Sequence, residues 1–164
     1  MRNIGRVTAL FACLMLAPVS LSHAVEKKAS PVSEKKAQPQ VVHRLVIQVN
    51  QNDPAVMNLA LNNATNVIEY YRAKGEEVDL DVVTYGPGLH MLRSDTSPVA
   101  DRIKALKNLA FPSKIQFSAC NNTKENMEKK EGHPVAVMSE AVLVPSGVIR
   151  LMELLEKGWS YIRP

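Results

Sequence analysis

The chain has 164 residues, of which 46% are hydrophobic and 22% are charged, with a formal net charge of +4 at neutral pH. The first 40 residues carry this charge, because 14 basic and 14 acidic residues balance one another from Val41 onward. A neutral body has no basic face with which to neutralise phosphates, so the composition excludes nucleic acid as the expected partner.

Residues 1–24 have the pattern of a secretory signal peptide. Two arginines precede the mostly apolar residues 7–21, and the small side chains of Ser22 and Ala24 stand at positions −3 and −1 of a cleavage site. The apolar part is shorter than the roughly 20 residues that a membrane-spanning helix needs. We therefore expect cleavage after Ala24, a periplasmic or secreted product, and no membrane span once the signal is removed.

The composition changes twice after the signal peptide. Residues 25–40 hold no aromatic residue, no Leu and no Ile, so they cannot offset chain entropy by burial, and we predict a disordered linker. Residues 41–164 suit one compact domain with a single core.

Removal of Cys13 with the signal peptide leaves Cys120 as the one cysteine of the mature chain, which excludes an intramolecular disulfide.

Strand and helix patterns alternate along this domain. The predicted elements are, in chain order, a strand at 44–49, a helix from 54 to about 74, a strand at 78–85, a short helical piece at 89–93, a helix from about 97 to 109, a strand at 114–119, a helix at 123–130, a strand at 141–144, a helix between 146 and 158, and a strand at 159–162. This alternation predicts an α/β sandwich with a mainly parallel sheet and helices over both faces. The ends of the first helix are the clearest, with Asp53 as N-cap, Pro54 in the first turn and Gly75 as the stop.

Polar or glycine-rich segments follow the first three predicted strands: NQNDP, YGPGL and ACNNT. Ligands of open parallel sheets bind at the carboxyl ends of the strands, so these segments are the candidate site. We expect Gly86, Pro87 and Gly88 to form a tight strand-to-helix turn, with presentation of their amides to an anion as the alternative. The chain has neither a GxGxxG fingerprint nor a GxxxxGK[ST] loop, and no cofactor is expected.

Cys120 is the most distinctive residue at these strand ends. Asn122 is the predicted N-cap of the following helix, with Glu125 at the spacing of a capping box. A sulfur at this position would face unpaired N–H groups and the positive end of a helix dipole, which stabilise the thiolate and lower the pKa of a thiol. Two alternatives to a reactive thiol stay open. The first is that Cys120 is a small buried core residue, as most free cysteines are, and the second is that it forms a disulfide between two chains.

Two other polar patterns give weaker signals. His90 and His133 lack the paired-ligand spacing of a metal site, so no metal is expected. Asn58, Asn62 and Asn66 recur every four residues on the first predicted helix, although asparagine is a mediocre helix former. This stripe fits either a polar interface between subunits or a solvated helix face.

Four segments together resemble the DsrE/DsrF-like sulfur-relay family, and most closely its stand-alone, often exported members of unassigned activity. They cover nearly all of residues 44–164 in the expected order: LVIQVNQNDPAVMNLALNNATNV, VVTYGPGLHMLRSD, FSACNNT and VPSGVIRLMELLEKGWSYIRP. The resemblance implies a three-layer α/β/α domain with a five-stranded sheet. It also implies a homo-oligomer, either a trimer or a hexamer.

The resemblance also implies an activity. In sulfur-carrying members of the family, one cysteine after a central strand accepts sulfane sulfur as a persulfide and passes it on, and Cys120 occupies the matching place. The chain would then be a sulfur carrier or sulfurtransferase with donor and acceptor proteins as partners. The other residues expected to form the site are Asn50, Gly86, Pro87, Gly88, Asn121, Asn122 and Thr123.

A function of a different class remains as the alternative. The chain would be a non-catalytic oligomeric binding module that takes a small anion or a partner protein at the same strand ends. Cys120 would then be a packing residue.

If Cys120 is instead reactive, a lone thiol in an oxidising compartment needs shelter from over-oxidation, which a subunit interface would provide.

Overall fold

The structure of the protein is a computed structural model that describes residues 42–164. The predicted signal peptide at 1–24 and the predicted linker at 25–40 lie outside the described residues. Among residues 42–164, no helix combines the length and the apolar character needed to cross a bilayer.

Strands and helices alternate throughout the described part of the chain. In order they are β1 (Val42–Val49), α1 (Pro54–Ala73), β2 (Glu77–Thr84), the 3-10 helix η1 (Gly86–Leu92), α2 (Ala100–Leu109), β3 (Lys114–Cys120), α3 (Asn121–Glu131), β4 (Ala141–Val144), α4 (Gly147–Glu156) and β5 (Ser160–Ile162). The strands form one sheet in the order β4-β3-β2-β1-β5, and every pairing is parallel. The predicted α/β fold is confirmed, with a sheet that is wholly parallel.

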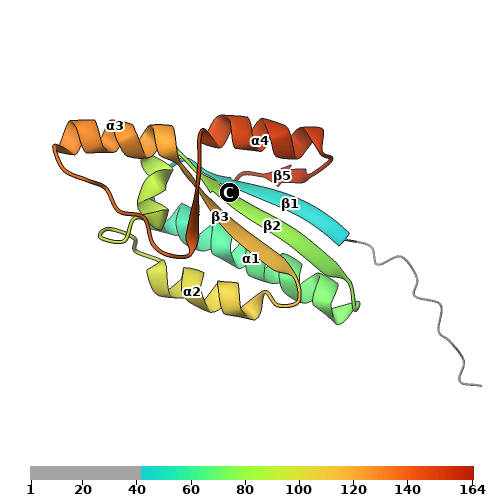
Figure 1. The fold of residues 1–164 in the computed structure, drawn as a ribbon. Helices are drawn as coiled ribbons and strands as arrows, with labels where there is room; N and C mark the ends of the chain where they lie inside the picture. Colours follow the sequence, from blue (N-terminus) through green and yellow to red (C-terminus); the bar gives the residue numbers. More distant parts are fainter. Residues whose placement is uncertain (1–41) are drawn as a thin grey trace, which may run out of the picture. The chain divides into compact units, whose positions relative to one another are not determined.

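The helices form a layer on each face of the sheet (Figure 1). α1 and α2 lie on one side, and α3 and α4 lie on the other. The main core lies between the sheet and α1, α2 and η1. Alternate strand residues point into it, and these are Leu45, Ile47, Val49, Val78, Leu80, Val82, Ile115, Phe117 and Ala119. Burial of each large side chain of this kind stabilises the fold by roughly 1.5–3 kcal/mol.

The second face of the sheet has a smaller core. Val46 and Val83 pack there against Leu151 and Leu154 of α4. Alternation along β3 points Phe117 into the main core and turns Gln116 and Ser118 toward this second face. α4 therefore covers a face that is only partly apolar.

Most predicted helix ends are confirmed. Asp53 Oδ1 accepts a hydrogen bond from the Ala55 N–H at 2.7 Å, and Ser146 Oγ accepts one from the Ile149 N–H at 3.5 Å. Gly75 follows α1 with a φ of +71°, the left-handed conformation that glycine adopts without strain. α2 begins at Ala100, two residues after Pro98, because the segment before it forms turns.

The predicted capping of α3 is wrong. Cys120, not Asn122, is the N-cap residue, and β3 passes into α3 without a loop. β4 is the cause, because Cys120 still pairs with Val144 and the strand therefore extends to the helix start. The Asn122 N–H donates to the Pro145 carbonyl at 3.3 Å. Glu125 accepts from the Asn121 side chain at 2.7 Å and takes no part in a capping box.

The asparagine stripe on α1 joins two helices of the same chain. The side-chain oxygens of Asn58 and Asn62 accept hydrogen bonds from Arg102 of α2, the second at 2.7 Å. Asn66 is exposed. Two of the three asparagines therefore have hydrogen-bond partners within the chain, and no subunit interface is needed to explain them.

Gly88 marks the closest approach between η1 and the sheet. A Cβ atom at this position would lie 2.2 Å from the Val49 carbonyl oxygen and 2.8 Å from the Asn50 Cα. Both contacts are with backbone, which cannot swing aside as a side chain can.

We therefore expect Gly88→Ala to lower the free energy of unfolding by roughly 3 kcal/mol, since it overpacks a buried site. Gly132→Ala is the matched control, because nothing lies within 4 Å of its Cβ position and only its φ of +74° is unfavourable. The control should cost about 1 kcal/mol. Urea unfolding followed by circular dichroism measures both, and equal losses would contradict the packing argument.

Candidate functional site

Cys120 lies where a strand becomes a helix. It is the last residue of β3, with φ −68° and ψ 114°, and it is the N-cap residue of α3. Its side chain is buried, with 4% of the residue exposed, and its thiol is free. An N-cap side chain normally accepts a hydrogen bond from the first turn of its helix, and Cys120 makes no such bond.

Two helices begin beside this cysteine. Cys120 is in register with Val144 of β4, and α4 begins at Gly147 after its N-cap Ser146. Tyr85, the residue after β2, packs so closely on this start that a Cβ at Gly147 would lie 2.9 Å from the Tyr85 Cβ. The N-termini of α3 and α4 therefore flank the end of β3. Each carries a partial positive charge from its aligned peptide dipoles.

A buried polar network lies on the same face of the sheet as Cys120. Asp81 of β2 is 1% exposed, and its carboxylate accepts from Ser118 Oγ at 2.7 Å and from Arg150 Nε at 2.9 Å. Gln116 Nε2 donates to Ser118 Oγ at 2.8 Å. Since Gln116, Ser118 and Cys120 alternate along β3, they point to one face. Burial raises the pKa of the Asp81 carboxyl, while its hydrogen bonds with Ser118 and Arg150 act in the opposite direction.

The sequence analysis did not identify this network. A signal was present, because Asp79 and Asp81 alternate with apolar residues inside the strand predicted at 78–85. A carboxylate at such a position needs a buried partner. The partner, Arg150, lies 69 residues further along the chain in α4, and no local pattern connects the two.

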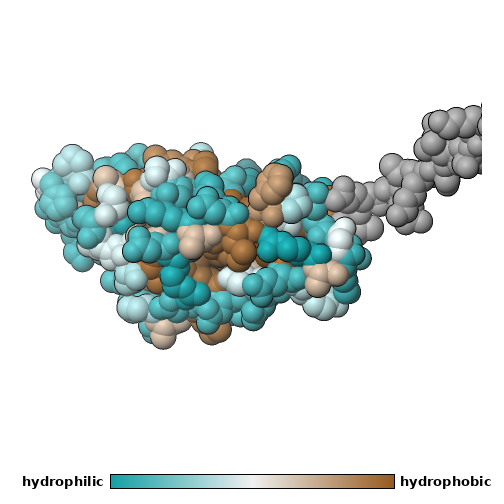
Figure 2. All heavy atoms as spheres, turned by 90° about the horizontal axis from the view of Figure 1, so that it is seen from below, coloured by the Kyte–Doolittle hydropathy of each residue, from teal (hydrophilic) through white to brown (hydrophobic). Residues whose placement is uncertain are grey.

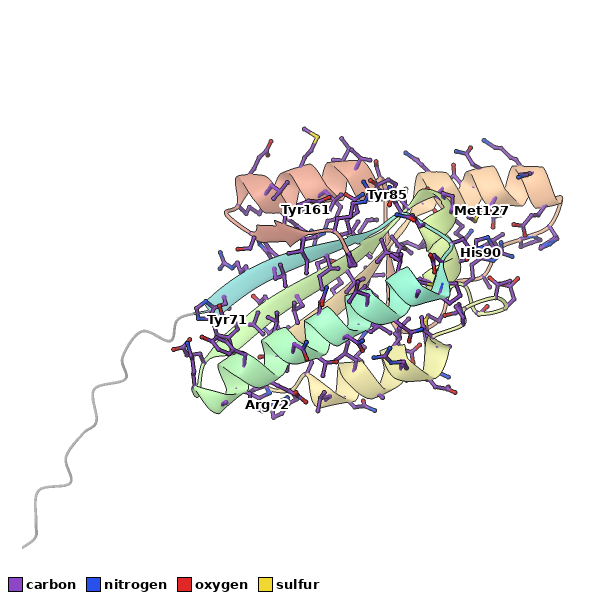
Figure 3. The ribbon with its side chains drawn as sticks, turned by 180° about the vertical axis from the view of Figure 1, so that it is seen from behind. Tyr71, Arg72, Tyr85, His90, Met127 and Tyr161 are labelled. Atoms are coloured by element: carbon purple, nitrogen blue, oxygen red, sulfur yellow. The ribbon has the colours of Figure 1, made fainter. Side chains whose placement is uncertain are left out.

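A cavity of about 580 Å³ lies between η1 and α3, within the range of small-molecule sites. Figure 3 shows His90 and Met127, from these two elements, at the same end of the molecule. The lining residues are Asn52, Gly86, Pro87, His90, Thr123, Asn126, Met127, Lys130 and Glu131.

The residues predicted for the site separate into two groups. Gly86, Pro87 and Thr123 line the cavity, and the Gly86 N–H donates to Thr123 Oγ1 at 3.0 Å, which joins the start of η1 to α3. The predicted residues that do not line the cavity are Cys120, Asn50, Gly88, Asn121 and Asn122. The cavity and the cysteine are therefore separate features of the same strand ends.

Arg93 holds Glu131, one of the residues that line the cavity. It is 3% exposed and binds two carboxylates, Asp95 at 2.9 and 2.7 Å and Glu131 at 2.6 and 2.9 Å. Its guanidinium lowers the pKa of Asp95 to about 2 and also lowers the pKa of Glu131. Because one guanidinium is shared by two carboxylates, this cluster keeps a net charge of −1. Lys130 lines the cavity and makes no ion pair within residues 42–164, so its ammonium group is available to a ligand.

The described residues contain no cluster of three or more His, Cys, Asp or Glu side chains that could hold a metal ion. His90 instead makes a hydrogen bond of 2.9 Å from Nδ1 to Thr96 Oγ1. His90 lines the cavity, and its other ring nitrogen, Nε2, is available to a ligand there.

Comparison with known proteins supports the fold and assigns no activity. No family model matches the chain, and no curated protein matches it. A solved structure of a protein of unknown function from Methanobacterium thermoautotrophicum is similar, with 28% sequence identity and a TM-score of 0.61. The match covers 74% of this chain and 99% of that chain.

The ion pairs of Arg93 predict a loss of stability in acid. Because the native pKa values of Asp95 and Glu131 lie below the ordinary ones, their stabilisation is complete above about pH 5 and is lost as the pH falls through the native values, toward about 2 for Asp95. Urea unfolding between about pH 6 and pH 2 should show this loss in the wild type.

The doubly substituted Asp95→Asn, Glu131→Gln protein should be less stable at pH 6 and should change less with pH. Asp101→Asn is the control, because this carboxylate is fully exposed and lies 3.8 Å from Lys104. If the double variant kept the pH slope of the wild type, the acid sensitivity would arise elsewhere.

Proposed function

We propose that this chain is an exported DsrE/DsrF-like sulfur carrier in which Cys120 holds sulfur as a persulfide. The observation that supports this most is the position of Cys120 as the N-cap of α3, next to the start of α4. Helix N-termini favour anions, and both the thiolate and the persulfide of Cys120 are anions.

The proposed reaction exchanges one sulfur–sulfur bond for another. The Cys120 thiolate attacks the terminal sulfur of a donor persulfide, R–S–SH. The S–S bond of the donor breaks, a new S–S bond forms on Cys120, and the donor leaves as the thiolate R–S⁻. An acceptor thiolate then removes the sulfur in the same way. No external oxidant or reductant takes part in either step.

The burial of Cys120 is consistent with a sheltered thiol. A side chain of which 4% is exposed meets few oxidants, which a thiol in the proposed periplasmic or secreted location requires. The same burial restricts donors to small sulfur species or to a protein that docks tightly over the strand ends. Assembly into a trimer or a hexamer, as the family resemblance implies, is part of this proposal.

The test is sulfur uptake by Cys120. After incubation of the reduced, folded protein with inorganic polysulfide, intact mass spectrometry should show added sulfur that dithiothreitol removes. Cys120→Ser should gain none. If the folded wild type gains no sulfur while the same thiol reacts fully with iodoacetamide after unfolding in urea, the carrier proposal fails and Cys120 is a core residue.

A second candidate function is a binding module that takes a small anion at the cavity. It offers the Lys130 ammonium, the free ring nitrogen of His90 and the amides of Asn52 and Asn126. Cys120 does not line it. In this alternative the cysteine contributes packing alone.

For the cavity, we expect thiosulfate to bind with an affinity that Lys130→Gln lowers about tenfold, which corresponds to 1.4 kcal/mol. Lys129→Gln is the matched control, since Lys129 lies next to Lys130 on α3 and does not line the cavity. Isothermal titration calorimetry measures all three proteins. Equal affinities would show that any binding reflects general charge and not this cavity. Binding that survives Cys120→Ser would separate the cavity from the thiol.

A further inference from the structure

The apolar side of α4 extends beyond the part that faces the sheet. Leu151 and Leu154 face the sheet and are buried. Four more apolar residues of α4 are each about half exposed: Val148 at 50%, Ile149 at 51%, Met152 at 51% and Leu155 at 45%. A surface helix normally places its apolar residues against the core and polar residues elsewhere. In Figure 3 the outer side chains of α4 extend away from the sheet with no other element above them.

The neighbouring helix shows that this composition is specific to α4. α3 lies in the same layer (Figure 1), has no buried residue and is polar over most of its length, as expected for a helix in water. The view from below in Figure 2 shows hydrophobic atoms among mostly hydrophilic ones. Within the layer of α3 and α4, the exposed apolar residues are therefore a feature of α4.

The exposed apolar area has the size of an interface. Tyr161 of β5 is 42% exposed and lies directly beneath α4 in Figure 3. Together with the four half-exposed residues of α4 it presents a surface on the order of 450 Å², backbone atoms and the tyrosine hydroxyl included, compared with the roughly 800 Å² that each partner buries in a standard interface. The rest of such a contact would come from the charged surface next to it.

The charges around this surface are complementary to one another. Glu153 and Glu156 are exposed on α4. On the adjoining open part of the sheet, Arg44 of β1 and Lys114 of β3 flank Asp79 of β2 in one row, which gives the row a net positive charge. Within residues 42–164 none of these five side chains forms an ion pair. Each chain thus carries an acidic group on α4 and a positively charged row on the sheet, and the acidic group of one copy could bind the row of another.

We propose that the outer side of α4 and the adjoining open part of the sheet form an interface with a second copy of this chain, related by a two-fold axis. The two-fold axis places the acidic edge of each α4 against the basic row of the other copy. This inference rests on the oligomer proposed above and makes it more specific, because two-fold contacts occur in dimers and dihedral hexamers and do not occur in a simple ring of three.

The interface would also lie close to the reactive end of the sheet. α4 begins at Gly147, beside Tyr85 and Cys120. A second copy on α4 therefore shields this end of the helix layer from solvent. It adds to the shelter from oxidants that burial within the chain already gives Cys120.

The test is the solution mass of the full chain by sedimentation velocity at micromolar concentration. The wild type should contain an even number of copies. Met152→Glu places a charge in the centre of the surface and should raise the dissociation constant at least about thirtyfold. Leu59→Glu is the matched control, because Leu59 is 47% exposed on α1 and should leave the mass unchanged. Met152→Ser, which adds no charge, guards against misfolding and should weaken assembly less strongly.

A monomeric wild type would overturn the inference and would leave α4 to a different protein or to another segment of this chain. A trimer, or an assembly that Met152→Glu does not change, would overturn it as well. Sulfur uptake by Cys120 is measured on the same samples. Uptake that fails in an intact even-numbered assembly contradicts the carrier proposal and supports the interface, so the two failures are distinguishable.

Discussion

The parallel direction of all five strands is the constraint from which the rest of the structure follows. A chain that leaves a strand at its carboxyl end must return to the opposite end of the sheet before it can enter the next strand in the same direction. Helices that run back over a face of the sheet make these connections. Every strand therefore ends at one edge, and helix N-termini collect there. Cys120, the start of α4 and the η1 turn lie at this edge because of the topology, although they are up to 60 residues apart in the sequence.

The two faces of the sheet serve different purposes. The face toward α1 and α2 is a continuous apolar core with the largest buried side chains, and it stabilises the domain. The face toward α4 combines a small apolar core with the Asp81, Ser118 and Arg150 network. A buried ion pair gives little net stability compared with apolar packing but penalises every arrangement that separates the charges. The network therefore fixes the position of α4 across the sheet, and β3 takes part in both faces.

The sequence predicted what depends on local pattern. The strands, the caps of α1 and α4 and the terminating glycines were all visible, because alternation and capping act over a few residues. The N-cap of α3 was misplaced because the end of β3 is set by pairing with β4, more than 20 residues later. The cavity and the Asp81 network were missed for the same reason, since their residues meet only when the strands are in order. Gly86 and Thr123 lie within hydrogen-bond distance of each other, because parallel topology alone brings strand ends to one edge.

The direct passage from β3 into α3 also limits how the length of the chain can vary. One added residue before Asn121 would rotate α3 by roughly 100° about its axis, and one added within β3 would turn Ser118 and Cys120 to the opposite face of the sheet. The first change would displace Glu131 of α3 from Arg93. The second would remove Ser118 from its hydrogen bond with Asp81. Between α3 and β4 the backbone of Ala136 and Met138 is hydrogen-bonded to Ser94 and Leu92, and the exposed residues 132–134 precede this coupled part. Insertions and deletions in related chains are therefore expected at residues 132–134, while the length of the junction at Cys120 stays constant.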